Sequence, residues 1–195
     1  MECLFGFVGK DFVVTVSDNS AARSITVMKT DEVKSRELNK HTLMLYSGEP
    51  GDTVQFAEFI QCNVQLYGIR NGVELSPVSA ARYTRRELAN SLRSKHPYQV
   101  NLLIGGCNEK EGPSLHWIDY LGAYTSVPFA SHGYGAFYLM SLFDRFHRPD
   151  INTEEAKVLV QKCIEELKRR FIVNLPNFSI KIIDREGIRD LDVVY

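Results

Sequence analysis

The chain has 195 residues, of which 44% are hydrophobic and 24% charged, and its formal net charge is −1. This length and composition are typical of a globular protein with one sizeable core, so we expect a single domain over residues 1–195. The near-zero charge argues against a nucleic-acid-binding protein, which usually carries a basic excess. No apolar run approaches the ~20 residues that a membrane-spanning helix needs.

The N-terminus does not have the positively charged and apolar segments of a secretory signal peptide, which indicates a protein of the cytoplasm and nucleus. The four cysteines are far apart in the sequence and form no CxxC pair. We therefore expect free thiols in or near the core, and neither a disulfide nor a metal site. These cysteines are Cys3, Cys62, Cys107 and Cys163.

Short apolar runs open the chain. Residues 4–8 and 12–16 are joined by Gly9-Lys10-Asp11, which predicts a β-hairpin. Residues 25–28 and 42–46 have the composition of two further strands. The first quarter of the chain is therefore predicted to be β-structure.

The hydrophobic period then changes to that of a helix. Phe56, Ile60 and Val64 recur at helical spacing within residues 52–67, and Gly72 is expected to end this helix. Ser76-Pro77 predicts the start of a second helix, because serine caps a helix and proline suits its first turn. We expect this helix to continue to His96-Pro97.

The second half of the chain repeats this order. Residues 100–104 and 115–118 are predicted to be strands of a hairpin, because turn-forming residues separate them. Helices are predicted over 133–146 and from Asn152 to about 170, where acidic residues open the helix and basic residues close it. Alternation over 178–182 predicts a last strand.

This order of strands, two helices, strands, two helices and strands predicts a fold of the α+β class. Each helix pair needs an apolar surface to cover, and each sheet needs its apolar faces buried. Two stacked sheets with a helix pair on each outer side satisfy both needs. The sequence therefore predicts a four-layer αββα sandwich.

Four segments carry a more specific signal: GDTVQFAE at 51–58, PYQVNLLIGG at 97–106, IDYLG at 118–122 and ASHGYG at 130–135. In these segments the chain resembles the beta subunits of the proteasome core particle, more narrowly the beta-4 branch of that family. The resemblance extends over essentially the whole chain. It implies the αββα fold of the N-terminal-nucleophile hydrolases.

The resemblance also implies assembly and no cofactor or metal. Beta subunits of this family form a seven-membered ring within a cylinder of about 28 alpha and beta subunits that degrades proteins. Catalytic members begin with a threonine whose hydroxyl attacks the peptide bond and whose α-amino group acts as the base. Aligning Lys10-Asp11 with their first hairpin places Glu2 at the position of that threonine.

Glutamate has neither a hydroxyl nor a thiol, so we expect a non-catalytic subunit. Met1 precedes Glu2, and we expect no propeptide to be removed. By resemblance, Asp18, Lys34 and Gly48 are remnants of the family site, matching its aspartate, its lysine and its oxyanion-stabilising glycine. We expect Asp18 and Lys34 to form an ion pair inside the sandwich.

Three further family positions are lost in this chain. A serine position falls on Gly133, and an aspartate and a serine position fall near Phe171 and Asn174. An alternative is that Cys3 becomes an N-terminal thiol nucleophile after removal of the first two residues. A further possibility, compatible with the non-catalytic interpretation, is that the subunit shapes the active site of a neighbour.

Overall fold

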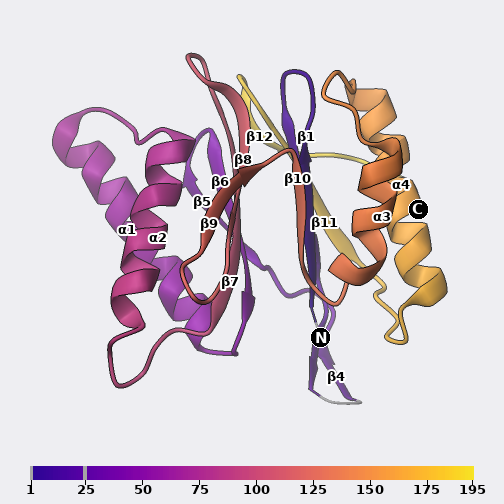
Figure 1. The fold of residues 1–195 in the computed structure, drawn as a ribbon, viewed down its shortest axis with the longest axis horizontal. Coiled ribbons are helices and arrows are strands. Elements are labelled where there is room, and N and C mark those ends of the chain that lie inside the picture. Colours follow the sequence, from indigo (N-terminus) through magenta and orange to yellow (C-terminus); the bar gives the residue numbers. More distant parts are fainter. Residues whose placement is uncertain (1, 24–25) are drawn as a thin grey trace.

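We describe the fold from a computed structural model, in which residues 2–23 and 26–195 are described. Two stacked β-sheets form its centre, and a pair of helices covers each outer face (Figure 1). The elements are β1 Cys3–Val8, β2 Val13–Asp18, β3 Ala21–Arg23, β4 Thr26–Lys29, β5 Ser35–Asn39, β6 Thr42–Gly48, α1 Asp52–Asn71, α2 Pro77–Ser91, β7 Val100–Asn108, β8 Gly112–Ile118, β9 Tyr124–Val127, β10 Phe129–Gly133, α3 Ala136–Phe146, α4 Thr153–Arg170, β11 Phe178–Asp184 and β12 Gly187–Asp190.

Within the described residues each large sheet has five strands, and all their pairings are antiparallel. The first sheet has the order β10-β1-β2-β11-β12, and the second has the order β5-β6-β7-β8-β9. The pair β3-β4 forms a separate short hairpin. The first strand therefore lies between β2 and β10, well inside its sheet.

Three apolar clusters hold the four layers together. One lies between the first sheet and helices α3 and α4, and includes Phe5, Phe143 and Leu167. A second lies between the second sheet and helices α1 and α2. The third joins the inner faces of the two sheets, with Leu4 and Leu115 among its members. The predicted four-layer αββα sandwich is thus confirmed.

Local sequence explains where the helices begin and end. The side chain of Ser76 caps α2 at the N–H of Ser79, and Pro77 takes the first helical position. Asn152 and Glu155 form a reciprocal capping box at the start of α4. Gly72 ends α1 in the left-handed conformation, which a glycine adopts without steric cost.

Some predicted boundaries were wrong. The helix α2 ends at Ser91, before the predicted stop at His96-Pro97. The predicted helix over 133–146 begins only at Ala136, because residues up to Gly133 belong to β10, whose backbone pairs with β1. Strands β3, β5, β9, β10 and β12 were missed. The strand predicted over 25–28 corresponds to β4, and Ile25 lies outside the described residues.

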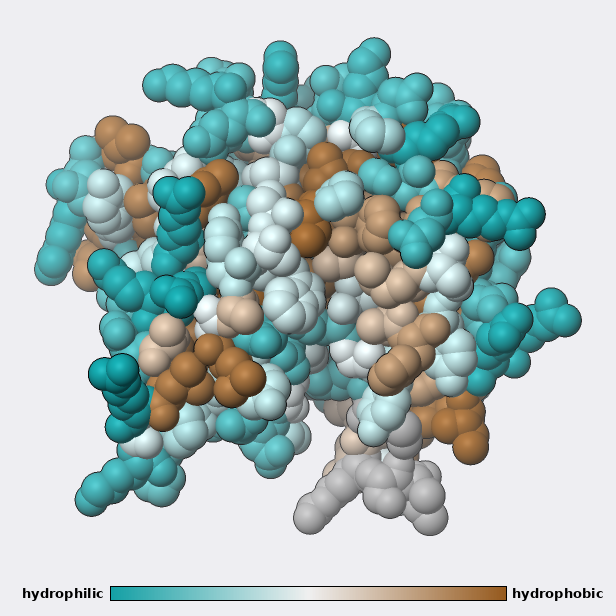
Figure 2. Space-filling model, viewed as in Figure 1, coloured by the Kyte–Doolittle hydropathy of each residue, from teal (hydrophilic) through white to brown (hydrophobic). Residues whose placement is uncertain are grey.

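The surface carries apolar side chains as well as charged ones, and on the face seen in Figure 2 the apolar ones form separate patches. Ile69 of α1, Phe137 of α3 and Ile172 after α4 are 81%, 82% and 91% exposed. Contiguous apolar patches mark surfaces that contact other proteins, whereas single exposed apolar side chains are common on any protein surface. In the described part of the chain, no helix has both the length and the apolar character needed to cross a membrane.

Candidate functional site

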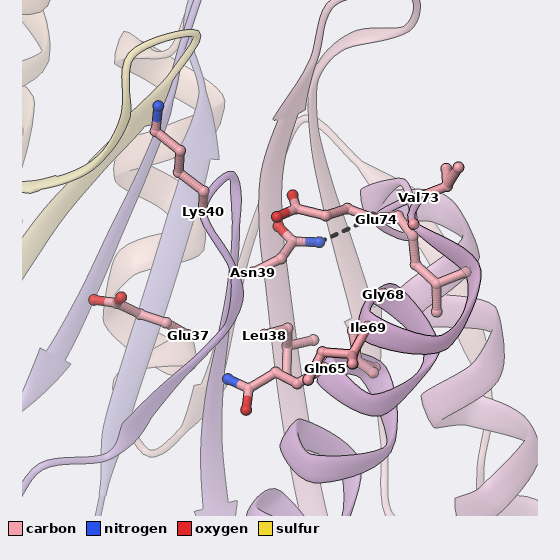
Figure 3. Close-up of a pocket in the computed structure, with 12 residues that line it drawn as sticks. Glu37, Leu38, Asn39, Lys40, Gln65, Gly68, Ile69, Val73 and Glu74 are labelled. Carbon is pink, nitrogen blue, oxygen red and sulfur yellow. Dashed lines mark hydrogen bonds between the residues drawn. The ribbon is translucent and has the colours of Figure 1, made fainter.

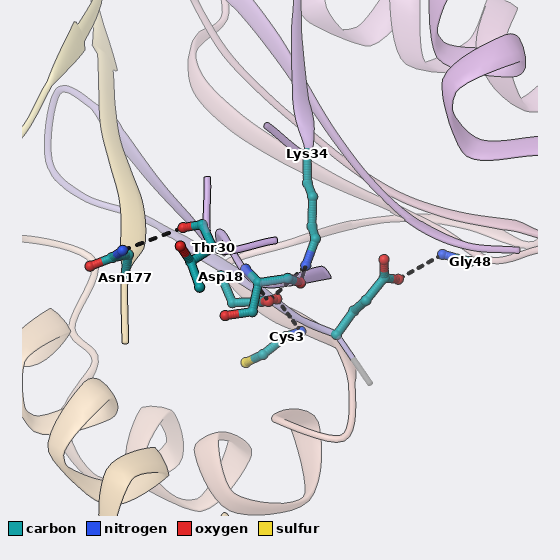
Figure 4. Close-up of polar contacts among 8 residues, drawn as sticks. Cys3, Asp18, Thr30, Lys34, Gly48 and Asn177 are labelled. Atoms are coloured by element: carbon teal, nitrogen blue, oxygen red, sulfur yellow. Dashed lines mark hydrogen bonds and ion pairs between the residues drawn. The ribbon is translucent and has the colours of Figure 1, made fainter. Parts of the chain in front are cut away.

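A buried ion pair lies where β2 ends and the chain leads into β5. The Nζ of Lys34 donates to Oδ2 of Asp18 at 2.7 Å, and the two side chains are 3% and 0% exposed (Figure 4). Both residues were predicted to form such a pair inside the sandwich. The structure brings them together from positions 16 residues apart in the sequence.

Backbone groups complete the bonding of this pair. Lys34 Nζ also donates to the carbonyl of Ser20 at 2.7 Å, and the N–H of Ser20 donates to Oδ2 of Asp18 at 3.2 Å. The other oxygen of Asp18 accepts from the backbone N–H of Cys3 at 2.7 Å. Because a buried charge is costly unless it is paired and hydrogen-bonded, these contacts stabilise the pair.

The carboxyl group of Glu2 reaches the end of β6. Its Oε2 accepts from the backbone N–H of Gly48 at 2.9 Å, drawn as a dashed line in Figure 4. Burial raises the pKa of Glu2, while the charge of Lys34 and the N–H of Gly48 act to lower it. Glu2 is therefore held beside the ion pair in a partly dehydrated position.

The backbone conformation of Gly48 requires glycine. Its φ is +144°, and a Cβ atom at this position would lie 2.0 Å from the carbonyl oxygen of Gln99. Any other residue would clash with β7 or move the end of β6. The N–H that Glu2 contacts is thus fixed in place by the sheet.

Cys3 points in the opposite direction from the ion pair, into the apolar core. Its side chain is fully buried in the cluster that includes Leu139 of α3 and Cys163 of α4. Burial, with a smaller effect of Asp18, raises the pKa of its thiol far above the usual range. A Cβ at Gly135 would lie 2.1 Å from its Sγ, so the thiol has almost no free space around it.

Gly133 lies beside Glu2. It pairs with Cys3 in the register of β1 and β10, has a φ of +78°, and would bring a Cβ within 2.1 Å of the carbonyl oxygen of Glu2. The predicted site residues Glu2, Asp18, Lys34, Gly48 and Gly133 therefore do come together, at one end of the two sheets.

Phe171 and Asn174 take no part in this polar cluster among the described residues. Phe171 ends α4 and packs its ring near Tyr134 and Tyr138. Asn174 lies in the loop between α4 and β11. Their predicted positions in the site follow from alignment with the family alone and stay a prediction.

Sequence reasoning missed two contributors to this region. The backbone of Ser20 forms hydrogen bonds to both members of the ion pair. The Nδ2 of Asn177 donates to the carbonyl of Thr30 at 3.3 Å, which joins the start of β11 to the segment that leads to Lys34. The proximity of Ser20 to Asp18 in the sequence could have indicated the first contact. The second depends on tertiary packing and has no local signal.

The prediction about the cysteines can now be compared with the structure. The four cysteines are free, as predicted, and three of them are buried, but Cys62 is exposed on α1 because it lies on the helix face away from the sheet. Among the described residues, no three side chains of the types that bind metal form a cluster.

A groove of about 630 Å³ lies between the C-terminal half of α1 and strand β5 (Figure 3). It is lined by aliphatic groups such as Ile69 and Val73, with the carboxylates of Glu37 and Glu74 at its edges. Its lining in the described chain contains no serine, threonine, cysteine or histidine. The groove shares no residue with the cluster around Asp18.

Comparison with known proteins places this geometry in one family. The family described as "Proteasome subunit" matches residues 2–183. This match covers more than half of the chain and includes all the predicted site residues.

Individual relatives match over nearly their full length. The chain is 47% identical to the probable proteasome subunit beta type-4 of Schizosaccharomyces pombe over 194 residues, which is 99% of this chain and 100% of the relative. It is 46% identical to the proteasome subunit beta type-4 of Saccharomyces cerevisiae, with 98% of each chain covered. It is 50% identical to the proteasome subunit beta type-2 of Oryza sativa, with 97% of this chain and 89% of the relative covered.

Proposed function

We propose that this chain, which belongs to the proteasome subunit family as a beta subunit close to beta type-4 and beta type-2, is a non-catalytic structural subunit of the core particle. Family membership implies assembly with other proteasome subunits and a part in protein degradation. The finer claim is that this subunit occupies one fixed place in a seven-membered beta ring of a particle of about 28 subunits.

The observation that carries the proposal is the residue at the nucleophile position. Glu2 presents a carboxyl group that accepts a hydrogen bond from Gly48, and it has no hydroxyl or thiol to attack a peptide bond. Catalytic groups that act as a unit lose most of their rate when the nucleophile is absent. Asp18, Lys34 and Gly48 are then structural remnants, and Gly133, Phe171 and Asn174 are lost positions.

The alternative is an active hydrolase that uses Cys3 after processing. Two features of the structure oppose it. The backbone N–H of Cys3 is bonded to Asp18 within the sheet, and its thiol lies in the apolar core with a raised pKa, where little thiolate forms. An N-terminal nucleophile needs a free amine and an accessible thiol, and Cys3 has neither in this arrangement.

Exposed apolar side chains on both helical layers are compatible with a role in assembly. Ile69, Phe137 and Ile172 lie on opposite outer sides of the sandwich, as expected for a subunit that has neighbours on more than one side. On this proposal residues 1–195 act as one domain, the particle resides in the cytoplasm and nucleus, and no cofactor is needed. The subunit also helps to wall the chamber and can shape the active site of a neighbour.

Intact mass and N-terminal sequencing of this chain from the purified native particle test the proposal. The expected result is a chain that retains Glu2 within an assembly of proteasome subunits. A chain that begins at Cys3 would contradict it. In the same particle, Cys3→Ala should leave every peptidase activity unchanged, whereas the alternative predicts loss of one activity.

A further inference from the structure

Two arginines of α2 line a hollow where the helix meets the loop between β8 and β9. The hollow has a volume of about 300 Å³ and is lined by Arg82, Arg85, Gly122, Ala123 and Tyr124. Arg82 and Arg85 are three positions apart in the helix, so both project from the same face. In the described part of the chain, this lining contains two positive charges and no carboxylate.

The loop holds Arg85 in a defined orientation. The Nε of Arg85 donates to the carbonyl of Gly122 at 2.8 Å. Gly122 has a φ of +74° and packs so closely on α2 that an added Cβ would lie 3.2 Å from the Cβ of Ala89. The Oδ1 of Asp119 closes the loop by accepting from the N–H of Ala123 at 2.8 Å. The guanidinium group is thus anchored through Nε, and its two terminal amino groups form no further hydrogen bond to a described residue.

Neither arginine is neutralised within the described chain. Arg86, which follows Arg85, pairs with Glu87 at an Nε–Oε1 distance of 3.5 Å, whereas Arg82 and Arg85 form no ion pair with a described residue. Like charges one helical turn apart repel each other. The charge of Arg82 also reaches His116 of β8, where burial first and this charge second lower the pKa of the imidazole to about 4. An incoming anion would therefore neutralise an uncompensated positive charge.

We propose that Arg82 and Arg85 form a docking site for the carboxylate of an aspartate or glutamate that a neighbouring proteasome subunit places in this hollow. Guanidinium groups bind carboxylates through two parallel hydrogen bonds, and an arginine that is already orientated loses less freedom on binding. Arginine is also enriched in the buried parts of protein interfaces. The inference deepens the proposed function and rests on its assembly with other subunits, but not on the residue at position 2.

A protein side chain suits this hollow better than the phosphate of a nucleic acid. The formal net charge of the chain is −1, so its long-range attraction for a polyanion is weak. Membership of the proteasome subunit family, in contrast, implies protein neighbours. The occupant of the hollow is therefore assigned to another subunit.

Competition for a place in the particle tests the site. A tagged copy of the chain is expressed beside the untagged wild-type chain, and native mass spectrometry of the purified particles measures the share of each. Arg82→Glu should lower the incorporation of the tagged copy by at least about tenfold, because repulsion replaces an ion pair in the interface. Arg86→Glu makes the same change on the same helix outside the hollow, and its incorporation should stay within about twofold of the wild type.

The variant at position 82 must also fold. The unfolding midpoint of the full-length Arg82→Glu chain, measured alone, should lie within about 1 °C of the wild-type value, because its side chain forms no ion pair with a described residue. If Arg82→Glu does not fold, Arg82→Gln decides the question, since it removes only the charge and should lower incorporation by about threefold or more. Incorporation of a folded position-82 variant at the wild-type level would overturn the proposal.

Zero-length cross-linking identifies the group that occupies the hollow. A carbodiimide joins an amine to a carboxylate in direct contact, so Arg82→Lys in the purified particle should become linked at position 82 to an aspartate or glutamate of another subunit. Linkage only within the same chain would contradict the proposal, as would nucleic acid that co-purifies with the wild-type particle and is lost from the Arg82→Glu particle. If the wild-type chain itself is absent from the particle, the proposed function fails too. If the wild-type chain is present and Arg82→Glu is incorporated equally well, this inference fails alone.

Discussion

The ammonium group of Lys34 contacts the carboxylate of Asp18 at 2.7 Å in a place where neither side chain reaches solvent. Asp18 also accepts from the backbone of Cys3, so the pair ties the loop before β5 to the first strand of the other sheet. Opposite charges buried in this way depend on each other, because each is costly to bury alone. The pair is therefore expected to stabilise the fold.

Removing one partner of the pair should destabilise the chain strongly. We expect Lys34→Met to lower the free energy of unfolding by about 3–5 kcal/mol, because Asp18 is left buried without its counter-charge. The double variant Asp18→Asn with Lys34→Met should cost less than the sum of the single variants, because no unpaired charge remains. Chemical denaturation measures these free energies.

The exposed pair of Lys29 and Glu32 is the matched control, with an Nζ–Oε2 distance of 3.1 Å at the surface. Lys29→Met should change the free energy of unfolding by about 1 kcal/mol or less. Equal costs for Lys29→Met and Lys34→Met would contradict the structural role assigned to the buried pair.

Replacing Gly48 should disturb the contact between the ends of β6 and β7. Gly48→Ala should lower the free energy of unfolding by about 2–4 kcal/mol, because its Cβ meets the carbonyl oxygen of Gln99 and its φ is unfavourable for alanine. Gly51 has a φ of +97°, but a Cβ added to it would meet no atom within 4 Å. Gly51→Ala therefore isolates the backbone cost, about 1–2 kcal/mol. Similar losses in the two variants would show that the clash with Gln99 is relieved.

Two buried histidines should make the fold sensitive to acid. Burial lowers the pKa of His116 and of His132 from 6.5 to about 4. Between these values the unfolded chain binds protons that the folded chain does not, so stability falls as the pH falls from 6.5 to about 4. The loss should reach roughly 3 kcal/mol for each histidine.

Unfolding free energies measured across this pH range test the histidine prediction. His116→Gln should reduce the loss on acidification, because it removes one group that takes up a proton on unfolding. His96 is exposed, and His96→Gln should leave the pH dependence close to that of the wild type. A pH dependence that is the same in all three chains would refute the prediction.

The sequence predicts most of the elements because hydrophobic period and capping residues are local signals. The helices at Pro77 and Thr153 begin where Ser76 and Asn152 predict. Strand β10 was missed because its pairing with β1, more than 120 residues away, is non-local, as the bond from Ser131 to the carbonyl of Leu4 illustrates. The hydrophobic periodicity within a segment does not reveal a partner strand that is distant in the sequence.

In the candidate site, too, some residues could be identified from the sequence and one contact could not. Asp18, Lys34 and Gly48 could be identified through resemblance, and the ion pair follows from the cost of buried charge. The bond from Gly48 to Glu2 could not be predicted, because it depends on a backbone donor left unpaired where β5 and β6 diverge. Glu2 precedes β1 of the first sheet and Gly48 ends β6 of the second, so this contact forms only when the two sheets are stacked.

The four cysteines should differ sharply in their reactivity toward iodoacetamide. Cys62 is exposed and should be alkylated first, in the native chain. Burial raises the pKa of Cys163 to about 12 and raises those of Cys3 and Cys107, so these thiols should react at least about 100-fold more slowly and only when the fold opens. Mass spectrometry of peptides at successive times measures each rate.

Cys62→Ser should remove the fast phase entirely. Rapid labelling of Cys3 in the native chain would instead show an accessible thiol at the start of the first strand, and would favour the alternative in which Cys3 is a nucleophile.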